Sequence, residues 1–126
     1  MLRSFLMLAA FFGFTGVGLG AFAAHGLKSR LSDDYLAVFH TGVTYQLFHT
    51  LALLAVALLA VHLPGRLMLW AGILFALGIV LFSGSLYALT LSGVTQLGII
   101  TPLGGLAFLL GWLCLGLAAW RLAPAV

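Results

Sequence analysis

Charged side chains are scarce in this 126-residue chain, and acidic ones are almost missing. Only 6% of the residues are charged, compared with about a quarter in an ordinary soluble domain. Asp33 and Asp34 are the only acidic residues, and the five basic residues are spread along the chain. A nucleic-acid surface needs Lys and Arg gathered on one face, so we expect no nucleic-acid partner.

Metal ligands and catalytic pairs are equally scarce. The single cysteine, Cys114, excludes an internal disulfide. His40 and His49 fall on opposite faces of one predicted helix, so only one of them can join His25 in a site, and no carboxylate lies in an apolar stretch to complete it. No nucleophile and base share a suitable spacing either. We therefore expect no metal, no haem or other cofactor, and no enzymatic activity.

Long apolar runs fill the rest of the chain, in which 64% of the residues are hydrophobic. The four runs cover residues 4–24, 43–61, 67–91 and 102–120. Each is long enough to cross the roughly 30 Å hydrocarbon core of a bilayer as a helix. The sequence therefore predicts an all-α membrane protein, with residues 1–126 forming a single domain of four transmembrane helices.

Two of these runs have ends that need separate interpretation. Ala21-Phe22-Ala23 resembles a signal-peptide cleavage site, but the length of the first run and its glycine spacing favour a retained helix. Before the second run, Ser32 and the two aspartates indicate a helix start, which gives a helix over residues 33–62. Such a helix exceeds the hydrocarbon thickness. We therefore expect a short interfacial helix leading into the spanning part, 43–61, with a bend near Gly42.

Small residues recur at steps of three and four in the first and fourth runs. They line one face of each predicted helix, at Gly13, Gly16 and Gly20 and at Gly104, Ala107 and Gly111. Small faces allow helix backbones to approach closely in lipid. We expect these two faces to pack against each other or against another copy or a larger membrane complex.

Polar side chains within the runs suggest a second kind of role. The candidates are His25, Tyr45, Gln46, His49, Ser83, Ser85, Tyr87 and Thr101. Polar groups at membrane depth usually face the bundle interior and find partners there, which favours a structural role. The alternative is that they converge into one polar cluster that binds or conducts a small solute, an ion or a lipid headgroup.

Four motifs in this order resemble those of the YgdD-like family of small membrane proteins. They are GAFAAHGL at 20–27, YQLFH at 45–49, LFSGSLY at 81–87 and TPLGG at 101–105. Ala24, Phe39 and Gly42 depart from the family pattern, which has Gly, Trp and Ala there. The resemblance implies a four-helix integral membrane protein, with bacterial inner-membrane members and a eukaryotic transmembrane relative. It implies no activity, substrate or cofactor.

The basic residues predict the orientation. With four crossings, Arg3, Arg66 and Arg121 lie on one side of the membrane, and Lys28 and Arg30 lie on the other. Basic residues in short loops favour the cytoplasmic side. We therefore expect a bacterial inner-membrane protein with both termini in the cytoplasm, acting as a structural or interaction protein through its small-residue faces.

Overall fold

The computed structural model describes residues 1–122 and 124, and the other residues of the predicted 1–126 domain lie outside the described part. The first two long helices are α1 (Leu2–His25) and α2 (Asp33–Leu59). The third span consists of α3 (Arg66–Gly78), the π-helical segment η1 (Ile79–Ser83) and α4 (Gly84–Ser92). A 3₁₀ turn, η2 (Thr95–Ile99), leads into α5 (Thr101–Trp120).

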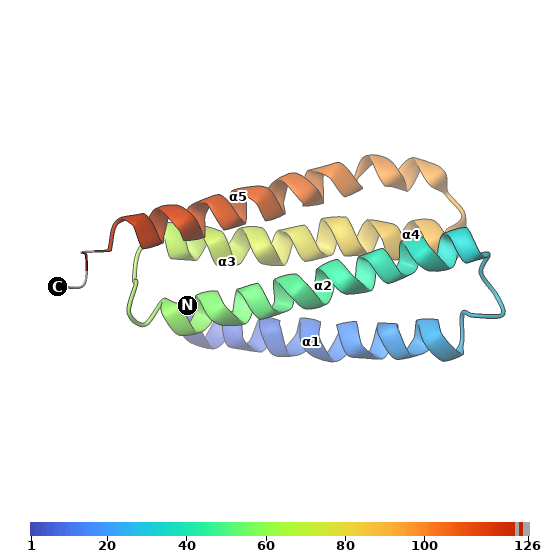
Figure 1. Ribbon diagram of the computed structural model, residues 1–126, viewed down its shortest axis with the longest axis horizontal. Coiled ribbons are helices and arrows are strands. Elements are labelled where there is room, and N and C mark those ends of the chain that lie inside the picture. Colours follow the sequence, from blue (N-terminus) through green and yellow to red (C-terminus); the bar gives the residue numbers. More distant parts are fainter. Residues whose placement is uncertain (123, 125–126) are drawn as a thin grey trace.

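Four of these helical units are long and apolar enough to cross a membrane, which confirms the predicted all-α, four-span architecture. They run side by side, with α1 and α5 at opposite edges and α2 and the third span between them (Figure 1). In the most apolar stretch of α2, 50% of the residues are buried, against 22% for α1 and for the last span. The outer helices therefore present most of their surface to lipid, and α2 is the central element.

The apolar core lies among α1, α2, α3 and α5. Phe75, Leu53 and Val56 are completely buried in it, and Phe5 reaches it from α1. A smaller cluster closes the end of the bundle near the first loop, where Phe39 and Val43 of α2 pack against Ala23 and Leu27. In lipid such interlocking side chains hold helices together by close packing rather than by exclusion of water.

The small-residue faces lie between helices of the same chain. A side chain added at Gly16 would meet Leu47 and Gln46 of α2, and one added at Gly20 would meet Val43. On α5, a side chain at Gly104 would overlap the backbone of Phe82 in η1. The helices in extensive contact are accordingly α1 with α2 and α3 with α5. The expectation that the two faces pack against each other is thus corrected: each packs against its neighbour in sequence.

The start of α2 is capped as predicted, because the Ser32 hydroxyl accepts a hydrogen bond from the Tyr35 N–H at 3.2 Å. From there α2 continues as one helix through Gly42, so the structure has no separate short helix before the spanning part. Gly42 instead gives room to the Tyr87 ring, whose edge atom Cε1 would lie 2.8 Å from an added Cβ. The placement of the first turns of α2 at the membrane interface stays a prediction.

Candidate functional site

Gln46 is the centre of a polar network that joins three helices. Its side-chain Nε2 donates to the Phe12 carbonyl and to the Thr15 hydroxyl of α1, both at 2.9 Å. Its Oε1 accepts a hydrogen bond from the Tyr87 hydroxyl of α4 at 2.6 Å. Gln46 is 3% exposed, so these three bonds form in an apolar surrounding. The network fixes α1 and α4 against the middle of α2.

Hydroxyl groups complete the polar contacts in the interior. The Ser83 hydroxyl in η1 donates to the Gly42 carbonyl at 2.7 Å, and Thr50 donates to the Gln46 carbonyl at 2.6 Å. Ser85 and Thr101 pair at 2.6 Å where α4 meets the start of α5. Within the described residues, no buried side-chain polar atom lacks a partner. This arrangement supports a structural role for the interior groups, because an unpaired polar atom is costly in hydrocarbon.

His49 forms a separate contact on the other side of α2. Its Nδ1 lies 2.8 Å from the Tyr45 carbonyl, and its Nε2 accepts the indole N–H of Trp112 of α5 at 3.1 Å. Since the indole is only a donor and the carbonyl only an acceptor, the ring carries its proton on Nδ1 and is neutral. The Phe108 ring stacks on the imidazole with a centroid distance of 3.6 Å. Both ring nitrogens of His49 are therefore in use.

Tyr45 differs from the other polar residues of the interior. Its ring packs against Phe82 at a centroid distance of 4.5 Å and stacks on His49 at 5.9 Å. The side chain is 42% exposed on the surface of the bundle. Within residues 1–122 and 124, the Tyr45 hydroxyl has no hydrogen-bond partner. The residue thus presents an unused polar group to the lipid side of the bundle.

A hollow of about 650 Å³ lies beside this residue, between α2 and α5. We call it the α2/α5 groove, and its walls include Tyr45, His49, Phe82, Gly105, Phe108 and Trp112. A smaller adjoining hollow shares Tyr45, His49 and Trp112 and also reaches Thr44. Small-molecule sites typically measure roughly 300–1,000 Å³ and are mostly apolar with a few polar groups. The groove has these properties and opens toward the surrounding lipid.

The polar residues predicted from the sequence fall into separate sets. Gln46 and Tyr87 join the central network, Ser83 lies next to it, and Ser85 pairs with Thr101. His49 and Tyr45 belong to the α2/α5 groove. His25 is exposed at the end of α1 and makes no side-chain hydrogen bond within the described part. The hypothesis that His25, His49 and Tyr87 converge into one polar cluster is therefore wrong.

Two residues of these sites escaped the sequence interpretation. Thr15 of α1 bonds Gln46, and Trp112 of α5 bonds His49. Both lie in apolar runs in which the regular spacing of small residues, rather than the polar side chains, was the basis of the prediction. Trp112 had one available signal: it lies near the middle of its run, whereas membrane tryptophans concentrate near the interfaces.

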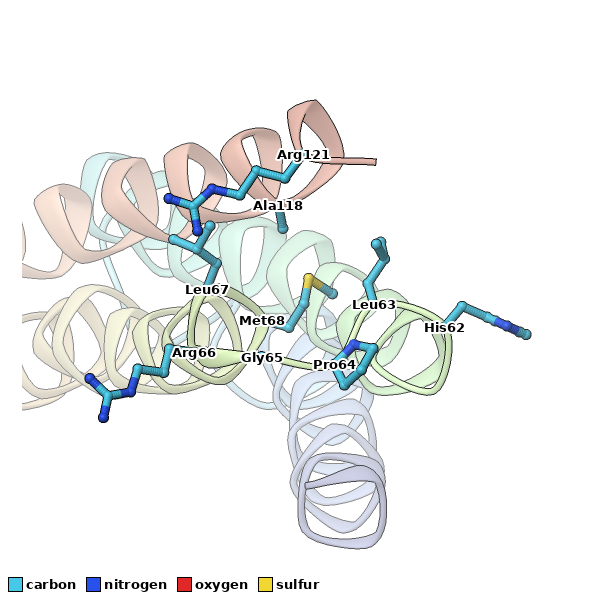
Figure 2. Close-up of a pocket in the computed structure, with 9 residues that line it drawn as sticks. All are labelled: His62, Leu63, Pro64, Gly65, Arg66, Leu67, Met68, Ala118 and Arg121. Carbon is cyan, nitrogen blue, oxygen red and sulfur yellow. The ribbon is translucent and has the colours of Figure 1, made fainter. Parts of the chain in front are cut away.

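A further hollow, of about 230 Å³, lies at the α2–α3 connection (Figure 2). His62, Arg66 and Arg121 border it and could attract an anion. In Figure 2, however, the side chains of His62 and Arg66 extend in opposite directions. These basic side chains do not converge on one ligand. Among the described residues, no three metal-ligating side chains gather anywhere.

Four apolar helices with a polar-centred interior define a small multi-pass integral membrane protein. The chain belongs to the family described as "Protein of unknown function (DUF423)", whose model matches residues 19–105. This finding confirms the resemblance noted in its motifs.

Several curated proteins are similar along nearly their whole length. The UPF0382 membrane protein YwdK of Bacillus subtilis is 49% identical, over 94% of this chain and 97% of its own. The UPF0382 inner membrane protein YgdD of Escherichia coli is 44% identical, over 95% and 92%. A UPF0382 membrane protein of Haemophilus influenzae is also 44% identical, over 96% and 97%. No solved structure matches. These relatives confirm the predicted inner-membrane location. Like the family description, their names assign no molecular function, as the sequence motifs implied.

Proposed function

We propose that this protein acts by binding a lipid-soluble small molecule in the α2/α5 groove, and that it is not an enzyme. The observation that carries the proposal is Tyr45, which lines the groove and whose hydroxyl has no hydrogen-bond partner among the described residues. In hydrocarbon such a group costs free energy unless something pairs with it. A bound molecule would supply that pairing.

The geometry of the groove supports this function in a second way. Trp112 and Tyr45 are both partly exposed beside it, so a molecule dissolved in the bilayer would reach them sideways, without passing through the bundle. His49 and Phe108, stacked on each other, give the groove a rigid floor. A preformed wall lowers the entropy that binding must offset.

Interaction with a membrane partner through the small-residue faces has less support. Gly16, Gly20 and Gly104 already contact neighbouring helices of the same chain. A partner or a second copy would have to use the outer faces of α1 and α5. We also propose, from the distribution of basic residues, that both termini lie in the cytoplasm.

Filling the groove tests the proposed function. A Cβ at Gly105 would meet only the Phe82 ring edge, at 3.9 Å, so Gly105→Leu fits the backbone while its side chain occupies the groove. Gly116→Leu is the matched control on the same helix, because nothing lies within 4 Å of its Cβ position. Both variants and the wild type would be extracted in native lipid discs and analysed by mass spectrometry.

We expect a non-phospholipid molecule to accompany the wild type and Gly116→Leu but not Gly105→Leu, with similar thermal stability in all three. The proposal is wrong if the wild type carries only bulk phospholipid, or if Gly105→Leu retains the same molecule at the same occupancy.

A further inference from the structure

The free hydrogen-bonding group of the α2/α5 groove is a hydroxyl whose proton is available to a ligand. The polar side chains in its wall are Tyr45, His49 and Trp112. The imidazole nitrogens and the indole N–H are already paired. The Tyr45 hydroxyl is left, and it can donate to a ligand. A ligand with an acceptor oxygen can therefore pair with the Tyr45 hydroxyl proton.

The absence of charged side chains from the described groove wall restricts the charge of the ligand. Within the described residues, no Asp, Glu, Lys or Arg lines the groove. A charged ligand would lie at membrane depth without a counter-ion, which is strongly unfavourable. The ligand is therefore neutral.

The aromatic wall favours a flat ring. Tyr45 lies nearly parallel to Phe108, with an interplanar angle of 23°, and Phe82 packs against both. Aromatic faces of this kind favour offset stacking with another planar ring. Leu106 and Leu109 extend the wall along α5 with apolar surface, which suits an aliphatic tail.

The depth of the groove indicates where the ligand resides. Tyr45 lies about 18 Å along α2 from Asp33, in a helix about 40 Å long, and Phe82 and Phe108 lie near the middle of the other two spans, so the groove is at the middle of the bundle. With the bundle centred in the bilayer, phospholipid headgroups do not reach the groove. A molecule with its polar ring here must dissolve in the hydrocarbon itself.

We infer that the α2/α5 groove binds a neutral ring carbonyl compound with an apolar tail, the chemistry of an isoprenoid quinone, whose carbonyl accepts a hydrogen bond from the Tyr45 hydroxyl. This inference rests on the proposed function of the groove and specifies its ligand class.

Trp112 provides a reporter inside the groove. Trp70 and Trp120, the other two tryptophans, are exposed near the end of the bundle where α3 begins and α5 ends, so Trp70→Phe and Trp120→Phe together leave Trp112 as the single fluorophore. The double variant Trp70→Phe/Trp120→Phe would be placed in vesicles and titrated with decylubiquinone, whose ring quenches indole fluorescence at short range, while the fluorescence of Trp112 is recorded. The same titration would use Tyr45→Phe and Gly105→Leu in that background. A brominated alkyl ester without a ring would serve as the second probe.

We expect saturable quenching by decylubiquinone, an affinity roughly five- to tenfold weaker in Tyr45→Phe from loss of one hydrogen bond, and only linear collisional quenching in Gly105→Leu. If both probes quench linearly and alike in every variant, the groove binds neither and the proposed function fails with the inference. If quenching saturates and needs the open groove, but Tyr45→Phe has no effect or the ester binds equally well, the ligand class is wrong while the groove remains a binding site.

Discussion

The indole N–H of Trp112 on α5 donates to Nε2 of His49 on α2 over 3.1 Å, and this bond bridges the two helices across the α2/α5 groove. The extensive helix contacts are those of α1 with α2, α3 with α5 and α2 with the third span. The bridge therefore joins two helices that otherwise meet mainly through side chains. It also sets the shape of the groove wall.

Removing the indole N–H should weaken the bundle moderately. Trp112→Phe leaves Nε2 of His49 without a donor, and we expect a loss of about 0.5–1.5 kcal/mol in the free energy of unfolding. Equilibrium unfolding in mixed micelles measures it. In a double-mutant cycle with His49→Leu, a similar coupling energy should appear. Trp120→Phe is the control, since that side chain is 87% exposed, and a loss as large as that of Trp112→Phe would contradict the assignment.

The protonation of His49 can be observed directly. Because Nε2 accepts from Trp112 and Nδ1 faces a carbonyl, the neutral Nδ1–H tautomer is expected. Nitrogen-15 NMR of selectively labelled histidine should show a protonated Nδ1 and an unprotonated Nε2 at neutral pH. In Trp112→Phe the preference should weaken. A predominant Nε2–H form in the wild type would contradict the hydrogen bond.

The glycines of α5 should respond very differently to the same substitution. A methyl group at Gly104 would overlap the backbone nitrogen of Phe82, so Gly104→Ala must push α5 away from η1. We expect a cost of about 1–3 kcal/mol from overpacking. Gly116→Ala has open space and should be neutral or up to about 1 kcal/mol more stable, because alanine favours the helix. Thermal unfolding in detergent compares the two, and equal effects would refute the close packing of α5 on η1.

The orientation of the chain has its own test. Arg3, Arg66 and Arg121 share one side in the four-span structure, so we expect both termini in the cytoplasm. Alkaline phosphatase fused after Leu122, which keeps Arg121, should be inactive, and a fluorescent protein at the same place should be bright. Phosphatase activity would show that the C-terminus lies outside the cytoplasm and would contradict the predicted orientation. The margin of basic residues is small, so adding two lysines between Gly26 and Ser32 should shift the fusions toward the opposite result.

The four spans follow from sequence because apolar length is a local property of the chain. The helix start capped by Ser32 could be predicted for the same reason, since the cap, the aspartates and the apolar run are adjacent in the sequence. The partners of Gln46 could not be derived this way. They depend on which neighbour occupies each face of α2, and helical spacing alone does not specify that.

The segment η1 shows a second reason for the difference between sequence and structure. It inserts a π-helical turn between Gly78 and Gly84, which rotates the residues that follow relative to α3. Ser83 thereby reaches the Gly42 carbonyl, while Ser85 faces Thr101. A regular helical period across the third span does not include this rotation, so sequence reasoning identified Ser83 and Ser85 as candidates but could not assign them to separate sites.

Photoaffinity mapping tests the central claim most directly. A diazirine-bearing decylubiquinone would be photolysed with the protein in vesicles, and the labelled residues identified by mass spectrometry. We predict adducts concentrated at Tyr45, Leu106 and Leu109, displaced by excess decylubiquinone and absent from Gly105→Leu. Labelling spread evenly over lipid-facing residues such as Phe14 of α1, with no displacement, would contradict binding in the α2/α5 groove.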